Sequence, residues 1–216
     1  MRGSSTGGTV TTISVISAVF NEEENVRETH EAIRSLFASL QRYDYEHIFM
    51  DNCSTDRTLQ VLKEIAAADA RVRIIAYSKN FGPIKSEMIG YRNASGDAVV
   101  CFDANLKDPP EMIASFIKLW EEGYDVVYGV RPRTHDNACM RLIRRAFYRV
   151  CTLLSEEPLP ENAGGFRLVD RKVVDELIAL DDYKPYVRGL ISSIGFRQIG
   201  LPYTRGARRR GRSKSS

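Results

Sequence analysis

Three polar side chains that could do chemistry, Asp103, Asn105 and Lys107, follow a short apolar strand that the sequence predicts over residues 98–102. If strand geometry continues past residue 102, these alternate positions face the same side of the backbone. Two consecutive prolines at 109–110 favour the start of a helix just downstream. Because a carboxylate, an amide and an ammonium at one strand end do not suit core packing, we expect a site for a phosphorylated ligand.

The elements that must position these residues alternate in type along the chain. Short strands rich in apolar and β-branched residues are predicted at 12–20, 45–50, 72–77, 98–102 and 125–130. Segments with apolar residues at helical spacing lie between most of them. This alternation predicts an α/β fold, in which helices cover both faces of a mostly parallel sheet.

Polar residues stand where four of these strands end: Asn21 with Glu22, then Asp51, Asn80 and Asp103. In parallel α/β sheets, ligands bind beyond the carboxyl ends of the strands. We therefore expect these side chains to meet at one rim of the sheet. The alternative is structural, because aspartates at strand ends also cap turns and helices.

The pattern changes after residue 130, where a polar loop begins at Arg131. We predict an amphipathic helix at 138–154, a strand at 164–170, a helix at 171–180 and a final strand at 194–204. The helix at 138–154 carries four arginines beside bulky apolar residues. Such a face suits either solvent or docking to a membrane surface.

Composition narrows the function classes. The chain of 216 residues has 43% apolar residues and a net charge of +3, which is typical of a soluble globular protein. Residues 205–216 hold six basic side chains and no acid, which suits phosphates or anionic lipid. Without a recognition motif or an aromatic array, we expect no nucleic acid partner. The four cysteines form no Cys-x-x-Cys pair, so we expect a reducing compartment and no zinc.

Several motifs together carry a family resemblance. Residues 14–25, 51–56 and 103–111 resemble the family 2 glycosyltransferases, which have the GT-A fold. The segments 128–131, 164–171 and 208–214 are similar to those of the members that transfer sugars to polyprenyl phosphates, such as dolichyl-phosphate mannose synthases and bactoprenol glucosyltransferases. The resemblance covers residues 12–214, nearly the whole chain.

This resemblance implies an inverting glycosyltransferase that moves a sugar from a nucleotide sugar, which we expect to be a UDP-sugar, to a polyprenyl phosphate in cell-envelope synthesis. By the family pattern, Phe20 and Glu22 approach the nucleoside and Asp51 meets the base. Asp103 meets the ribose or a Mg²⁺ or Mn²⁺ ion on the diphosphate, with Asn105 as the second metal ligand. The catalytic residues we expect are Asp103, Lys107 and Arg131.

The resemblance also sets the expected boundaries. Residues 1–10 are expected to be a disordered start, 11–204 the GT-A domain, and 205–216 a flexible basic tail that serves as an active-site loop. Within that loop, Arg208, Ser213 and Lys214 match family residues that close over the phosphates. We expect the protein to act peripherally on the cytoplasmic side of a membrane, and the apolar second half leaves room for a homo-oligomer.

Four positions depart from the family pattern, and the first is Ala18, where proline is usual. Asn105 stands where an Asp is usual, Lys107 where Gln is frequent, and Gly165 where many relatives carry Asp. An amide binds a hard cation without supplying charge, so the metal is either weakly held or dispensable. Lys107 offers a fixed positive charge in its place. Another reading is that transferase activity has been lost, leaving a protein that binds nucleotide sugars.

The absence of an acid at Gly165 bears on the acceptor. A sugar hydroxyl needs a general base, whereas a lipid phosphate is already ionised at neutral pH. Arginines that orient and screen the phosphate then suffice. The alternative acceptor is a saccharide hydroxyl, for which Glu156, Glu157 and Glu161 are candidate bases.

Overall fold

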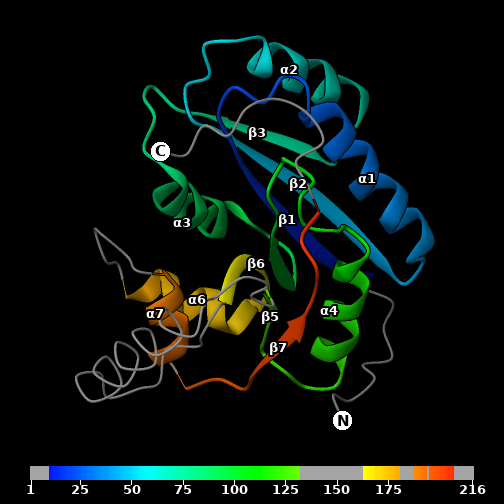
Figure 1. The fold of residues 1–216 in the computed structure, drawn as a ribbon, viewed down its shortest axis with the longest axis vertical. Helices are drawn as coiled ribbons and strands as arrows, with labels where there is room; N and C mark the ends of the chain where they lie inside the picture. Colours follow the sequence, from blue (N-terminus) through cyan, green and yellow to red (C-terminus); the bar gives the residue numbers. More distant parts are fainter. Residues whose placement is uncertain (1–9, 132–162, 181–186, 194, 207–216) are drawn as a thin grey trace, which may run out of the picture.

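The computed structural model describes residues 10–131, 163–180, 187–193 and 195–206. The described chain forms a seven-stranded sheet in the order β3-β2-β1-β4-β6-β5-β7, with helices packed against it (Figure 1). The strands are β1 (Thr11–Val19), β2 (Tyr43–Asp51), β3 (Val72–Ala76), β4 (Ala98–Cys101), β5 (Val126–Val130), β6 (Ala163–Asp170) and β7 (Gln198–Pro202). The helices are α1 (Val26–Ser39), α2 (Thr58–Ala68), α3 (Pro83–Asn93), α4 (Met112–Glu121), α6 (Arg171–Ala179) and α7 (Val187–Ser193).

The sheet is mostly parallel and has one reversed strand. Strand β1 pairs in parallel with β2 and β4, β2 with β3, and β5 with β7. Strand β6 is antiparallel to both of its neighbours, β4 and β5. The predicted α/β class, with a mostly parallel sheet flanked by helices, is confirmed.

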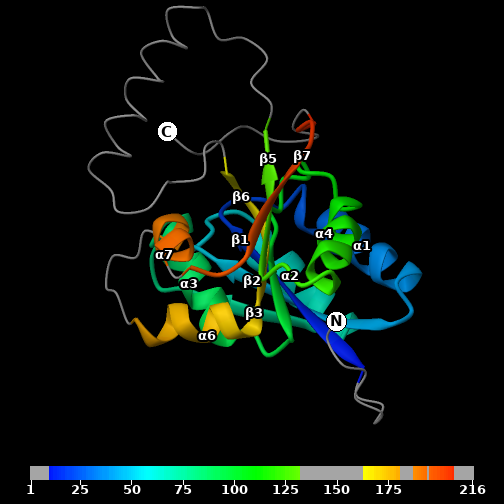
Figure 2. The ribbon, with the colours of Figure 1, turned by 90° about the horizontal axis from the view of Figure 1, so that it is seen from below.

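Helices cover both faces of the sheet. Helices α1 and α4 bury Ile33, Phe37, Phe116 and Trp120 against one face. Helices α3, α6 and α7 bury their apolar residues against the other, as the second view shows (Figure 2). Central residues of β1 and β4 are excluded from water on both faces, which accounts for their continuous apolar and small character.

The predicted elements of the first half match the structure to within two residues at most ends. Helix α3 begins at Pro83 after Gly82, whose φ of +81° suits glycine, and it ends at Asn93. In the second half, the strand predicted at 194–204 is shorter and spans residues 198–202. Residues 187–193 form helix α7, which was not predicted. The helix predicted at 138–154 lies outside the described residues.

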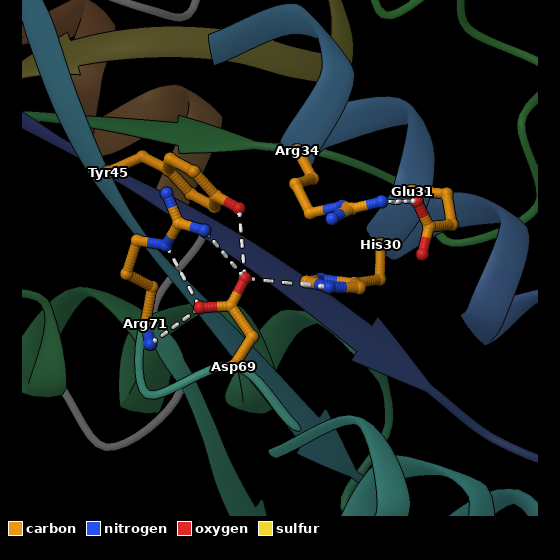
Figure 3. A network of polar contacts seen from close by, with 6 residues as sticks. All are labelled: His30, Glu31, Arg34, Tyr45, Asp69 and Arg71. Carbon is orange, nitrogen blue, oxygen red and sulfur yellow. Dashed lines mark hydrogen bonds and ion pairs between the residues drawn. The ribbon is translucent and has the colours of Figure 1, made fainter. Parts of the chain in front are cut away.

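A polar network ties α1 and β2 to the turn before β3 (Figure 3). Asp69 accepts hydrogen bonds from the backbone and guanidinium of Arg71, and His30 Nε2 lies 3.7 Å from its carboxylate. The Tyr45 hydroxyl donates to the same carboxylate at 3.4 Å. Arg71 holds the pKa of Asp69 down at about 2. Because β3 begins here, this network lies near the amino ends of the parallel strands, away from the rim considered below.

The topology brings separate chain segments to one rim. Val19 is opposite Asp51 in the register of β1 and β2, and Ile16 is opposite Cys101 in that of β1 and β4. Since β6 runs the other way, its beginning lies at this rim, where Val130 and Pro202 also end β5 and β7. Within the described ranges, no helix has both the length and the apolar character needed to cross a bilayer.

Candidate active site

A cavity of about 420 Å³ opens at this rim. Its walls come from the ends of β1, β2 and β4, the first turns of α3, the start of β6, helix α7 and the segments that follow β5 and β7. The volume lies within the range of about 300–1,000 Å³ that is usual for small-molecule sites. Among the lining residues are three arginines and two carboxylates, namely Arg131, Arg167, Arg205, Glu87 and Asp103.

Asp103 faces Arg205 across the mouth of the cavity. Arg205 Nη2 donates to Asp103 Oδ2 at 2.8 Å and to Asp108 Oδ2 at 3.1 Å. The Asp103 side chain remains 57% exposed because it opens into the cavity. Desolvation by the concave walls, together with the charge of Asp108, raises the pKa of Asp103, while Arg205 and Arg131 oppose the shift.

The buried carboxylate of Asp108 pairs with both Arg131 and Arg205. Its side chain is 1% exposed, and one carboxylate oxygen lies 3.0 Å from Arg205 Nε and 3.7 Å from Arg131 Nη2. The Tyr203 hydroxyl donates to Asp108 and accepts a hydrogen bond from Arg131 Nε at 3.1 Å. The side chains after β5 and β7 are thus fixed by one buried carboxylate after β4. Arg131 was predicted for this site, whereas the roles of Arg205, Asp108 and Tyr203 were not.

Asn105 and Lys107 do not extend the strand that precedes them. Strand β4 ends at Cys101, and Leu106 adopts φ +50°, so the expectation that strand geometry continues to residue 107 is wrong. The Asn105 Oδ1 atom accepts a hydrogen bond from the backbone nitrogen of Lys107 at 3.1 Å. Lys107 lines a neighbouring cavity of about 470 Å³, and its carbonyl accepts from Gly206.

The oxygen atoms near the cavity determine how a divalent metal ion could be held there. The described residues contain no group of three or more His, Cys, Asp or Glu side chains that could enclose an ion. Mg²⁺ is usually held by one or two carboxylates together with substrate phosphates rather than by a full protein cage. Asp103 lines the cavity, whereas Asn105 is not among the lining residues and its Oδ1 atom accepts the backbone N–H of Lys107. Asp103 is therefore the residue of this pair whose carboxylate suits an ion that is held largely by a bound diphosphate.

The loops after β1 and β2 lie at the same rim but do not line the main cavity. Buried Asp51 accepts hydrogen bonds from the backbone and hydroxyl of Ser54, so it fixes its own turn. Glu22 donates its backbone N–H to Thr58 Oγ1 at 2.7 Å and accepts from Asn25 with its carboxylate. Phe20 precedes this linkage and is half-buried. The predicted roles of Phe20, Glu22 and Asp51 in nucleoside binding stay predictions.

Other predicted residues fall elsewhere. Arg208, Ser213 and Lys214, like the candidate bases at 156, 157 and 161, lie outside the described residues. Gly165 does line the cavity, and a side chain added there would meet no atom within 4 Å. The main cavity is therefore open where many relatives were expected to place an acid.

Comparison with known proteins identifies the class. A profile of glycosyl transferase family 2 matches residues 14–178, and the chain belongs to this family. It is 38% identical over 202 residues to an uncharacterized glycosyltransferase, YkcC, of Bacillus subtilis, covering 93% of this chain and 62% of the relative. It is 33% identical to the bactoprenol glucosyl transferase of Shigella phage SfV, covering 94% of this chain and 66% of the relative. The chain thus spans about two thirds of the length of these relatives.

Solved structures agree on the fold. The mannosyltransferase PcManGT from Pyrobaculum calidifontis, solved with GDP-Man and Mn²⁺, superposes with a TM-score of 0.62 at 20% identity, over 88% of this chain and 54% of that one. Glucosyl-3-phosphoglycerate synthase from Mycobacterium tuberculosis, solved with Mn²⁺, UDP-glucose and phosphoglyceric acid, gives 0.56 at 22% identity, over 93% and 73%.

Proposed function

We propose that this chain is the catalytic part of an inverting glycosyltransferase that moves a sugar from a UDP-sugar to a polyprenyl phosphate in cell-envelope synthesis. The bactoprenol glucosyl transferases among its relatives support the acceptor class. A lipid acceptor must be reached at the surface of a bilayer. We propose that the protein acts peripherally on the cytoplasmic side. The proposed donor follows the sequence resemblance.

The observation that carries this proposal is the charge arrangement of the cavity. Asp103 and Glu87, the lining carboxylates, are each engaged by an arginine, Arg205 and Arg167 respectively. Arg131 adds a further cation, and Gly165 contributes no acid. A cavity of this kind suits two phosphate groups better than it suits activation of a hydroxyl.

The proposed reaction needs no proton transfer from the acceptor. An oxygen of the lipid phosphate attacks the anomeric carbon, and the bond from that carbon to the diphosphate breaks. The electron pair leaves with UDP, so charge grows on the diphosphate in the transition state. Fixed cations aimed at that charge lower the barrier. We assign this role to Arg131 and Arg205, which Asp108 holds in place.

A divalent ion, Mg²⁺ or Mn²⁺, is proposed as an accessory. Asp103 and Asn105 would hold it beside the diphosphate, where it would neutralise part of the phosphate charge. Because Asn105 brings no charge, we expect weak binding. The catalytic role predicted for Lys107 stays open, since this residue lines the neighbouring cavity.

The test is an assay of the protein with a panel of nucleotide sugars and undecaprenyl phosphate, with and without Mn²⁺. Glycolipid formed from a UDP-sugar is the expected result. Product that appears only with saccharide acceptors would contradict the proposed acceptor. Binding of nucleotide sugars without turnover, under every condition, would contradict catalysis.

A further inference from the structure

A polar cluster forms part of the wall of the main cavity. Glu87 from α3, Cys101 from β4 and Arg167 from β6 line the cavity, and Tyr91 lies behind them. None of these residues belongs to the Asp103–Asp108 anchor described above. The cluster is therefore a separate feature, and the proposed transfer step gives its residues no catalytic role.

The cluster engages one oxygen of Glu87 fully. Oε1 accepts a hydrogen bond from Arg167 Nη2 and another from the Tyr91 hydroxyl at 3.1 Å, and Cys101 Sγ lies 3.4 Å away. Burial raises the pKa of Tyr91 and of Cys101, so both stay protonated as donors at neutral pH. The carboxylate is thus locked in one orientation by groups from three elements.

The other oxygen, Glu87 Oε2, has no hydrogen bond to any of the described residues, and 20% of the side chain is exposed. Arg167 is 4% exposed, and its buried Nε also lacks a partner in this part of the chain. Buried polar groups in native proteins are nearly always satisfied. Because Glu87 lines the cavity, its Oε2 atom can accept a hydrogen bond from a polar ligand there.

Stability alone does not account for this pair. A buried ion pair is often no more stable than apolar residues of the same volume, because both charges lose their hydration. The surrounding wall is apolar, formed by Ile16, Met50 and Val187. A charged pair kept in such a wall is better explained by recognition.

We propose that Glu87 is a specificity-determining residue that accepts hydrogen bonds from the hydroxyl groups of the donor sugar, and that Arg167 positions it. This inference rests on the proposed function, because it assumes a nucleotide sugar in the cavity. The ligand class is a neutral, hydroxylated hexose. A uronic acid is disfavoured, because its carboxylate would lie close to that of Glu87.

The test compares the binding of UDP, UDP-glucose and UDP-glucuronate by calorimetry in the full chain and in the variant Glu87→Gln. The wild type is expected to prefer UDP-glucose to UDP-glucuronate at least tenfold. Hydrogen bonds to charged groups correspond to about 10- to 100-fold in affinity. Glu87→Gln should therefore weaken UDP-glucose at least tenfold, leave UDP within twofold, and erase the preference over UDP-glucuronate.

Glu64→Gln is the matched control, because Glu64 also pairs with an arginine, Arg27, but lies on exposed α2. It should leave all three affinities unchanged. If Glu87→Gln does not fold, Glu87→Asp keeps the charge while withdrawing the carboxylate by one methylene. That variant should lose at least fivefold of the preference for UDP-glucose over UDP.

The outcomes separate the two proposals. Equal weakening of all three ligands, or an unchanged preference in the folded variant, would overturn the role of Glu87 while leaving the nucleotide site intact. A wild type that binds none of the three ligands would overturn the proposed function and this inference together. A wild type that prefers UDP-glucuronate would overturn the assigned sugar class.

Discussion

His47 should make the protein unstable in mild acid. This residue is fully buried in β2, and its Nε2 atom lies 3.1 Å from Ser17 Oγ. The Ser17 hydroxyl already donates its only proton to the carbonyl of Phe102 at 2.7 Å, so His47 Nε2 must carry the hydrogen between them. His47 Nδ1 is then bare, buried and without a partner in the described chain. A second proton there would find no acceptor.

The size of the effect follows from this environment. Burial lowers the pKa of His47 from 6.5 to about 3, with a smaller contribution from His30. The unfolded chain therefore takes up a proton as the pH falls below 6.5, while the folded chain does not until about 3. The contribution of neutral His47 to the free energy of unfolding is therefore fully present above pH 6.5 and decreases as the pH falls from 6.5 toward 3. Between pH 7.5 and pH 5 the loss is about 2 kcal/mol.

Urea unfolding at the two pH values measures this loss, with the fluorescence of Trp120, the only tryptophan, as the signal. The variant His47→Gln keeps a donor for Ser17 and removes the titration. Its stability should fall by about 2 kcal/mol less than that of the wild type between the two pH values. His30, whose pKa burial also lowers, stays in both proteins and cancels in the comparison. An equal fall in both proteins would show that His47 does not cause the loss of stability in acid.

Four further outcomes test other parts of the molecule. Asn105→Asp adds a carboxylate to the proposed metal site and should raise Mn²⁺-dependent transfer several-fold, measured by Mn²⁺ titration; an unchanged titration curve would contradict the proposed ligand. Arg205→Ala should reduce metal-free transfer much more than Lys107→Gln, because Arg205 alone of the two lines the main cavity; the reverse order would restore the catalytic role of the lysine. Gly96→Ala should lower stability by about 1 to 3 kcal/mol in thermal unfolding, because its Cβ would lie 2.6 Å from a backbone oxygen of β1. Cys101, buried and with a raised pKa, should resist alkylation until the protein unfolds, as peptide mapping would reveal.

The fold was largely predictable because its signals are local. Alternating strands and helices, and a Gly–Pro start for α3, are properties of short segments. Their order also predicted that Asp51 and Asp103 would come to one rim, and the register of β1 between β2 and β4 agrees. Helix α7 escaped prediction because it has only seven residues, too few for a clear helical period.

The details of the site depend on contacts that local patterns do not encode. Arg205 reaches Asp103 only because β7 pairs with β5, whose sequence lies about 70 residues earlier. The arrangement of Asn105 and Lys107 was not predictable because β4 ends at Cys101 and because Leu106 takes a left-handed conformation that non-glycine residues rarely adopt. The pairing of Glu87 with Arg167 likewise joins elements 80 residues apart. The sequence indicated Arg205 only as one of the basic residues in the segment 205–216, without a specific role in the site.

Calorimetric titration of UDP into the wild type and into Arg131→Ala tests directly whether the rim of the sheet binds a diphosphate. Arg34→Ala is the matched control, since that arginine is exposed on α1 and pairs with Glu31. We expect that UDP binds, that Arg131→Ala weakens binding about 10- to 100-fold, and that Arg34→Ala has no effect. Absence of UDP binding, or equal affinity in all three proteins, would contradict a diphosphate site at the rim of the sheet.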